Sequence, residues 1–138
     1  MILILEDSLD RVARFRAVLQ SMRPEVSIII WRQAWKMIAE VEGYLPQATI
    51  ISLDHDLEPN PEDDTDPGDG VEVAKFLAQF SQPCPVIIHT SNGERAQWMA
   101  GEFDLEGWKH HRVLPYDDEW IERHWRRAVK RLLRRKRR

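Results

Sequence analysis

The feature that most constrains the fold is the stretch from Thr49 to Leu57, with the sequence TIISLDHDL. It begins as an apolar, β-branched run and ends in Asp54, His55 and Asp56. A continuous apolar run of this length is typical of a strand that is buried on both faces of a parallel sheet. The polar residues then fall at the carboxyl end of the strand, where open α/β sheets bind their ligands.

The polar end of this stretch has two explanations. Two carboxylates and an imidazole are costly to bury unless they are paired or bind a cation, which predicts a site. Alternatively, they form a polar strand end that is capped by its own loop. Because side chains alternate along a strand, Asp54 and Asp56 are expected to share a face, with His55 on the other. The acidic loop that follows, Glu58–Asp69, is expected to be a solvated lid rather than a second metal site.

Short apolar segments alternate with segments of helical periodicity along the whole chain. We expect strands at residues 1–5, Val26–Trp31, Thr49–Leu57, Val86–His89 and His111–Leu114. We expect helices at residues 9–22, Gln33–Glu42, Gly70–Phe80, from the Ser91–Glu94 capping box onward, and from Asp118 to the C-terminus. This alternation is typical of an α/β three-layer sandwich around a five-stranded parallel sheet. No repeat or linker is visible, which predicts a single domain over residues 1–138.

Charge is distributed very unevenly along the chain. The net charge is −3, yet residues 123–138 contain ten basic side chains and no acid. Residues 1–122 therefore carry 10 basic and 23 acidic side chains. A basic C-terminal helix and tail over residues 118–138 can bind nucleic acid in a salt-dependent manner. It can also keep an acidic protein soluble, or dock on an acidic loop of another molecule.

The composition argues against a membrane or secreted protein. No apolar run approaches the ~18 residues that are needed to span a bilayer. Residues 1–7 are too short and too acidic a segment for a signal peptide. Cys84 is the single cysteine, which excludes an internal disulfide and favours a reducing compartment. We therefore expect a cytoplasmic protein with no membrane partner, of an oligomeric state that the sequence leaves open.

Three of the predicted strands end in polar clusters. Glu6 and Asp7 follow the first strand, and residues 54–56 and 89–92 follow the third and fourth. In a flavodoxin-like sheet with the strand order 2-1-3-4-5, these three strands are neighbours and their clusters converge on one crevice. The carboxylates of Glu6, Asp7 and Asp54 would then offer the all-oxygen ligands that suit Mg²⁺ or Mn²⁺.

The cluster after the fourth strand adds groups that a metal site does not need. Ser91, with the first backbone N–H groups of the following helix, would bind an anion such as phosphate. His55 and His89 lie at the same predicted edge, and an imidazole is the side chain best suited to exchange protons near neutral pH. Beside a metal ion, such groups would supply acid–base catalysis.

The pattern resembles the receiver domains of two-component signalling. Receivers carry two acids after the first strand, a phosphoacceptor aspartate after the third, and Thr or Ser after the fourth. Those positions are occupied here by Glu6, Asp7, Asp54 and Thr90. Receivers also carry a lysine before a proline in the fifth strand, where this chain has Leu114 before Pro115. The resemblance implies a receiver-like fold, but the missing lysine argues against phosphoacceptor signalling.

The chain is more similar to a receiver-like family that is proposed to process cyclic phosphates. The shared motifs in this chain are Glu6-Asp7 with Arg11, Leu53–Leu57, Gly70–Ala74 and His89–Asn92. The similarity covers roughly residues 1–116. It implies divalent-metal-dependent processing or binding of cyclic phosphate groups, such as the 2′,3′-cyclic phosphates of nucleotides or of RNA ends.

The similarity also implies a role for each site residue. Metal binding is assigned to Glu6, Asp7, Asp54 and Asp56. Phosphate binding is assigned to Arg11, Thr90, Ser91 and Asn92. Catalysis is assigned to Asp54, His55 and His89. The alternative is a divergent signalling receiver that is phosphorylated on Asp54, or a binding module without catalysis.

Overall fold

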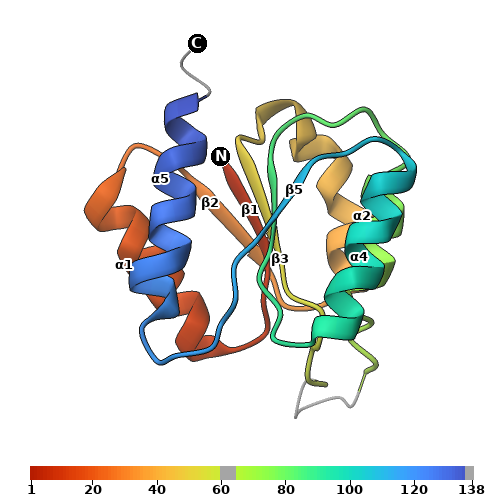
Figure 1. Cartoon of the computed structure of the whole chain (residues 1–138), viewed down its shortest axis with the longest axis horizontal. Coiled ribbons are helices and arrows are strands. Elements are labelled where there is room, and N and C mark those ends of the chain that lie inside the picture. The colour runs from red at the N-terminus through yellow and green to blue at the C-terminus, as the bar shows by residue number, and fades with distance from the viewer. Residues whose placement is uncertain (60–64, 136–138) are drawn as a thin grey trace.

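A sheet of five parallel strands organises the chain, in the order β2-β1-β3-β4-β5 (Figure 1). The strands are β1 (Ile2–Leu5), β2 (Ile28–Trp31), β3 (Ile50–Leu53), β4 (Val86–Ile88) and β5 (His110–Arg112). This order confirms the predicted flavodoxin-like, receiver-like fold. The computed structural model describes residues 1–59 and 65–135. The middle of the acidic loop and the end of the basic tail, for which we expect a lid and a nucleic-acid contact, lie outside the described residues.

The register explains why the central strands are apolar almost without interruption. Ile51 of β3 lies opposite Leu3 of β1 on one side and opposite Val86 of β4 on the other, and all three are fully buried. Helices cover both faces of the sheet, so the side chains on both faces of a central strand are buried. Ser52 of β3 is a buried polar exception within this apolar environment.

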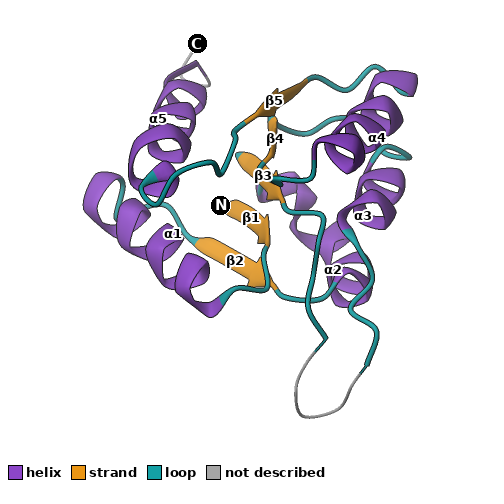
Figure 2. Cartoon of the chain, turned by 60° about the horizontal axis from the view of Figure 1, so that its bottom comes forward, coloured by secondary structure: helices purple, strands orange, loops and turns teal. Residues whose placement is uncertain are grey.

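Helices form the two outer layers (Figure 2). The helices α1 (Leu9–Met22) and α5 (Arg126–Arg135) lie on one face of the sheet. The opposite face is covered by α2 (Ala34–Glu40), α3 (Gly70–Leu77) and α4 (Gly93–Leu105). A 3₁₀ segment, η1 (Val41–Gln47), follows α2, and a π-helical segment, η2 (Ile121–Trp125), leads into α5. In the described ranges, no helix is both long enough and apolar enough to cross a membrane.

Several element ends differ from those predicted. The predicted end of the second helix at Glu42 is wrong, because α2 ends at Glu40 and the chain continues through Gly43 and Pro46 as the 3₁₀ segment η1. Val41 and Leu45 of this segment are buried. Their packing in the core therefore keeps the chain helical through Gly43, a residue that favours the end of a helix. The strands are also shorter than predicted, and β3 ends at Leu53, before the polar cluster.

The layer made of α1, η2 and α5 packs on the sheet through an aromatic core. Phe15 of α1 lies with its ring centroid 5.8 Å from that of Trp120 and 4.5 Å from that of Trp125. Val129 and Leu132 of α5 are buried in the same cluster. The basic C-terminal helix is therefore anchored in the core by its apolar side, and only its outer side presents charge.

The first residue of α3 is in close contact with the end of β3. The backbone N–H of Gly70 donates to the carbonyl oxygen of His55 at 3.1 Å. A Cβ at Gly70 would overlap the carbonyl oxygen of Asp54 and lie 2.8 Å from the Cα of His55. Both are backbone atoms, so neither can rotate aside. Glycine at position 70 therefore lets α3 hold the polar end of β3 in place.

We expect Gly70→Ala to destabilise the fold by at least ~1–3 kcal/mol, because the added methyl group overpacks a contact between backbones. Gly101→Ala is the matched control, since Gly101 lies inside α4 with no atom within 4 Å of an added Cβ. Alanine there should stabilise the helix by ~0.5–1 kcal/mol. Urea unfolding of both variants measures the two changes. If Gly70→Ala were as stable as Gly101→Ala, the proposed contact would be absent.

Candidate functional site

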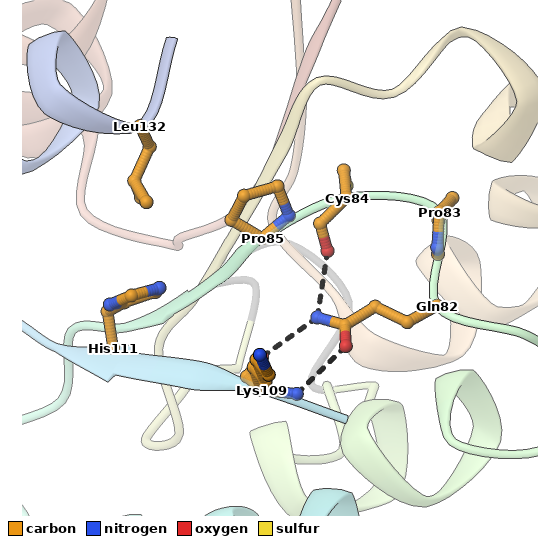
Figure 3. A pocket seen from close by; sticks show the side chains of 7 residues that line it. All are labelled: Gln82, Pro83, Cys84, Pro85, Lys109, His111 and Leu132. Atoms are coloured by element: carbon orange, nitrogen blue, oxygen red, sulfur yellow. Dashed lines mark hydrogen bonds between the residues drawn. The ribbon is translucent and has the colours of Figure 1, made fainter. Parts of the chain in front are cut away.

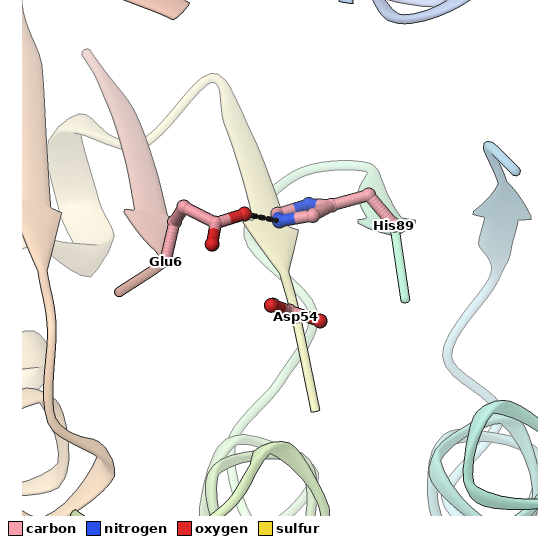
Figure 4. Close-up of side chains that lie close together, drawn as sticks. All are labelled: Glu6, Asp54 and His89. Carbon is pink, nitrogen blue, oxygen red and sulfur yellow. Dashed lines mark hydrogen bonds and ion pairs between the residues drawn. The ribbon is translucent and has the colours of Figure 1, made fainter. Parts of the chain in front are cut away.

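Three buried side chains meet at the carboxyl edge of the sheet (Figure 4). Glu6 follows β1, Asp54 follows β3 and His89 follows β4. One ligand atom from each lies within 4.8 Å of the others. Glu6 and His89 have no exposed surface, and Asp54 is only 5% exposed. The sheet order that the sequence predicts therefore brings the first, third and fourth strand ends together.

A chain of buried hydrogen bonds holds the imidazole of His89. Its Nε2 lies 3.1 Å from Glu6 Oε1, and its Nδ1 lies 2.7 Å from Ser52 Oγ. The indole N–H of Trp125 donates to Ser52 Oγ at 3.1 Å. Since an indole nitrogen only donates, Ser52 accepts from Trp125 and keeps one hydroxyl hydrogen for the Nδ1 of a neutral ring. In the neutral and the doubly protonated ring alike, the Nε2 hydrogen then faces Glu6.

Aromatic rings shield this imidazole from water. The ring of Trp120 stacks on His89 at a centroid distance of 5.7 Å, and Phe15 meets it edge-on at 5.3 Å. Both aromatic residues are buried. The hydrogen bond between His89 and Glu6 therefore lies in a dry environment, where electrostatic interactions are stronger than in water.

Arg11 forms the cationic side of the site. Its guanidinium nitrogen lies 3.6 Å from Glu6 Oε1 and 3.9 Å from Asp54 Oδ2. The guanidinium carbon lies 5.2 Å from the ring centroid of Trp120, in a cation–π contact. Ser8 caps α1 by accepting the backbone N–H of Arg11 with its side chain, and so fixes the start of the helix that carries Arg11. Arg11 is therefore placed to contact an anion that approaches Asp54.

The two carboxylates of the site have pKa values shifted in opposite directions. Burial, together with the nearby charge of Glu6, raises the pKa of Asp54 to about 6. Burial also opposes ionisation of Glu6, but the hydrogen bond and positive charge of His89 outweigh it and lower the pKa of Glu6. One carboxylate is thus firmly ionised while its neighbour is poised near neutrality, a combination that is common in catalytic and ligand-binding sites.

Asp7 and Asp56, the other predicted metal ligands, are not part of this group of three among the described residues. The carboxylate of Asp7 accepts the backbone N–H of Glu58 at 2.6 Å, and burial raises the pKa of Asp7. The carboxylate of Asp56 is exposed and lies 2.9 Å from Nδ1 of His55. Asp7 therefore ties down the start of the acidic loop, and Asp56 points to solvent.

His55 does not join His89 in the site. Its Nε2 lies 3.7 Å from Asp69 Oδ2 and has no hydrogen-bond partner in the part of the chain that the structure describes. Its backbone N–H donates to Asp54 Oδ1 at 2.8 Å. The expectation that Asp54 and Asp56 share a face is wrong, because β3 ends at Leu53 and the alternation of a strand does not extend past it.

The polar run after β4 is shifted by one residue from its predicted role in the helix cap. Asn92 caps α4, since its Oδ1 accepts the backbone N–H of Arg95 at 3.0 Å. The prediction that Ser91 is the cap is wrong, because Asn is at least as good an N-cap as Ser. Thr90 is buried and its Oγ1 accepts the N–H of Asn92 at 3.2 Å, whereas Ser91 is exposed.

A cavity of about 380 Å³ lies at the opposite edge of the sheet (Figure 3). Its lining includes Cys84, Lys109 and Leu132 but no carboxylate. Gln82 closes one side, because its amide donates to the Lys109 carbonyl oxygen and accepts the Lys109 N–H, both at 2.8 Å. Lys109 thus lies at the amino end of β5, across the sheet from Asp54, and does not replace the lysine that receivers carry.

Ser52 and Trp125 are the members of the site that sequence reasoning misses. Ser52 leaves one signal, a hydroxyl within an otherwise apolar strand, whose partner the sequence does not identify. Trp125 leaves no signal, since an aromatic residue at helical spacing is ordinarily a packing residue. Its indole reaches Ser52 only because η2 and α5 pack across β3.

The group fits a divalent cation. Glu6 and Asp54 bring two carboxylates into a buried space where the charge of one raises the pKa of the other. A cation held by both would relieve that repulsion. Carboxylate ligands suit both Mg²⁺ and Mn²⁺.

We expect Asp54→Asn to stabilise the metal-free protein at neutral pH. The carboxyl has a pKa of about 6 when folded against 3.8 as its ordinary value, so its burial costs stability above pH 6 and nothing below pH 3.8. The cost is at most ~3 kcal/mol, and Asn keeps an acceptor for the His55 N–H. Thermal unfolding in a chelator, near pH 4 and near pH 8, measures the difference. A variant no more stable than wild type at the higher pH would contradict the raised pKa.

Comparisons with solved structures place the fold among response regulators. The chain is similar to the response regulator domain of Thermotoga maritima CheB, with a TM-score of 0.65 and 16% identity, over 97% of this chain and 92% of that chain. It is similar to the phosphorylated cyanobacterial phytochrome response regulator RcpA, with a TM-score of 0.66 and 13% identity, over 96% and 91%. A chain of the CheX–CheY–BeF3–Mg complex from Borrelia burgdorferi gives a TM-score of 0.64 and 20% identity, over 96% and 84%.

At such identities these structures show a shared fold and no more. No curated protein sequence matches the chain. The family model described as the cyclic-phosphate processing receiver domain matches residues 1–104, which hold Glu6, Asp54 and His89. The chain therefore belongs to the cyclic-phosphate processing receiver domain family.

Proposed function

We propose that this protein opens cyclic phosphodiesters with the help of a divalent metal ion, Mg²⁺ or Mn²⁺. The expected substrates are 2′,3′-cyclic phosphates of nucleotides or of RNA ends. The observation that carries the proposal is the buried hydrogen bond between His89 and Glu6 beside Asp54 and Arg11. Phosphorylation of an aspartate makes no use of an imidazole at this place, whereas opening of a cyclic phosphate requires a proton donor.

Glu6 and Asp54 would hold the ion, since their carboxylates share the site and are close enough to bind one cation. The ion would neutralise charge on the phosphate and make water a better nucleophile. Arg11 would bind a phosphate oxygen beside it, because its guanidinium already lies within 4 Å of both carboxylates. Thr90, Ser91 and Asn92, at the start of α4, remain the proposed contacts for the other phosphate oxygens.

The proton transfers can be assigned to two side chains of the chain. As a water oxygen bonds to phosphorus, the carboxylate of Asp54 accepts the water's proton. As the bond from phosphorus to the ribose oxygen breaks, a protonated His89 donates its Nε2 hydrogen to that oxygen. The Nε2 atom already faces the other groups of the site, 3.1 Å from Glu6 Oε1. Transfer of a proton from Asp54 back to His89 within the site, where their ligand atoms lie within 4.8 Å of one another, restores the starting state.

The competing function is phosphorylation of Asp54, as in a signalling receiver. The shared fold with response regulators supports it. The absence of the receiver lysine argues against it. Leu114 stands before Pro115 where receivers carry that lysine, and Lys109 lies at the other edge of the sheet. Parallel incubation with 2′,3′-cyclic nucleotides and with a small-molecule phosphodonor, each with Mg²⁺ or Mn²⁺, decides between the two functions.

We expect Asp54→Asn to weaken Mn²⁺ binding at least tenfold in calorimetry, because it removes one of two anionic ligands. The matched control is Asp56→Asn. It removes the same charge two residues further along the chain, from a carboxylate that is exposed. That variant should bind the ion as wild type does. Equal weakening by both substitutions would mean that the ion binds by general electrostatic attraction and not in this site.

We expect His89→Gln to lower the turnover of 2′,3′-cyclic nucleotides by ~10²–10⁴-fold, the usual value of general acid catalysis. Glutamine can still donate an amide hydrogen to Glu6 but cannot release a proton, so the fold and Mn²⁺ affinity should persist. Circular dichroism and calorimetry check both. If the variant turned over substrate at the wild-type rate, or if wild type only accepted a phosphoryl group on Asp54, the proposed reaction would be wrong.

A further inference from the structure

A groove of about 330 Å³ between the end of β5 and α5 has no part in the proposed reaction. It is made by the last residue of β5, the segment that follows it, and the outer side of η2 and α5. The residues that give it its chemistry are Arg112, Leu114, Tyr116, His124, Arg127 and Arg131. Three guanidinium groups, a phenol ring and an imidazole therefore line one concave surface.

The groove offers both an aromatic face and positive charge. Tyr116 is 68% exposed and Leu114 is 45% exposed, a large apolar surface for a loop. The Tyr116 ring lies 5.4 Å from the imidazole of His124, which supports it from one side. An exposed aromatic ring beside arginines is the arrangement on which single-stranded nucleic acids stack their bases and place their phosphates.

Two of the three arginines of the groove lie on the basic outer side of α5. Arg127 and Arg131 are four residues apart on α5, so their side chains project from the same side of the helix. Both are exposed, and neither forms an ion pair within residues 1–59 and 65–135. By contrast, Arg123 in the preceding η2 pairs with Glu119 at 2.9 Å. The charge of α5 is thus left available to an anionic partner.

Arg112 joins the groove to the candidate site. Its guanidinium donates to the carbonyl oxygen of Thr90 at 2.6 Å, and Thr90 directly follows His89. After β5 the chain descends to the edge where the strands end, and α5 then runs back along the sheet from that edge (Figure 1). A single-stranded nucleic acid that lay in the groove with one end at the site would therefore extend along α5.

We propose that this groove binds single-stranded RNA, with a base stacked on Tyr116 and backbone phosphates on Arg127 and Arg131. The choice of RNA over DNA rests on the proposed function, since a 2′,3′-cyclic phosphate forms only on ribose. Binding itself does not depend on that function. The buried apolar side of α5 makes deletion of the helix uninformative, so the test uses exposed residues only.

The test is fluorescence anisotropy with a labelled single-stranded oligoribonucleotide that ends in a 3′-hydroxyl, in a buffer without divalent ions. We expect affinity to fall as salt rises, and the double variant Arg127→Glu/Arg131→Glu to bind at least tenfold more weakly, with a salt slope smaller by ~1.4. Tyr116→Ala should weaken binding by ~5–150-fold, the usual value of stacking on one base, whereas Tyr116→Phe should bind as wild type does.

The matched control is Lys36→Glu/Lys75→Glu, which changes net charge equally on exposed residues of α2 and α3, on the other side of the sheet. It should keep near-wild-type affinity. Equal weakening by the control, or undiminished binding by the groove variants, would overturn the proposal. So would a groove variant that changed only the oligomeric state in sedimentation, since the groove would then be a protein interface. The labelled RNA carries no cyclic phosphate, so its binding is measured independently of the reaction. Absence of turnover of 2′,3′-cyclic nucleotides would therefore refute the proposed function and leave the RNA-binding proposal standing.

Discussion

The hydrogen bond between Glu6 and His89 is the contact on which the site depends. It joins the ends of β1 and β4 across β3, and its continuation through Ser52 reaches Trp125. Because the chain of hydrogen bonds is buried, removal of any one member leaves a polar partner unsatisfied, at a cost of ~1–3 kcal/mol. The same bonds that stabilise the core therefore also orient the imidazole and ionise Glu6, and Asp54 is left as the carboxylate whose charge is not fully compensated.

The distribution of charge follows from where each segment lies on the sheet. Acids gather where the strands end, at Glu6, Asp54 and the loop beyond. The basic residues gather on α5, whose apolar side is required by the aromatic core, so that its outer side is free to carry arginines. Arg112 lies between these two regions and bonds to the strand end that holds His89. The arginines of α5 and a metal ion held by the acids would thus attract different parts of one anionic substrate.

The fold and the three central residues of the site could be predicted from the sequence. Apolar runs ending in Glu6, Asp54 and His89 indicate buried parallel strands, and every such strand delivers the residue after it to the same edge. The order 2-1-3-4-5 is the one expected for a flavodoxin-like sheet, and the observed sheet has it. Glycine at position 70 is likewise visible as a motif, although only the structure shows that a side chain there would meet the backbone of Asp54.

The tertiary structure alone decided which polar side chains enter the site. Strand periodicity predicts that Asp54 and Asp56 are equivalent, yet the strand ends before them and the loop turns Asp56 to solvent. Ser52 and Trp125 are 73 residues apart, and no local pattern pairs them. Sequence thus determined the elements and the edge they share, because hydrophobic periodicity is local. The contacts that orient His89 and shape the basic groove were decided by packing between distant segments, because a hydrogen-bond partner is chosen by proximity in space.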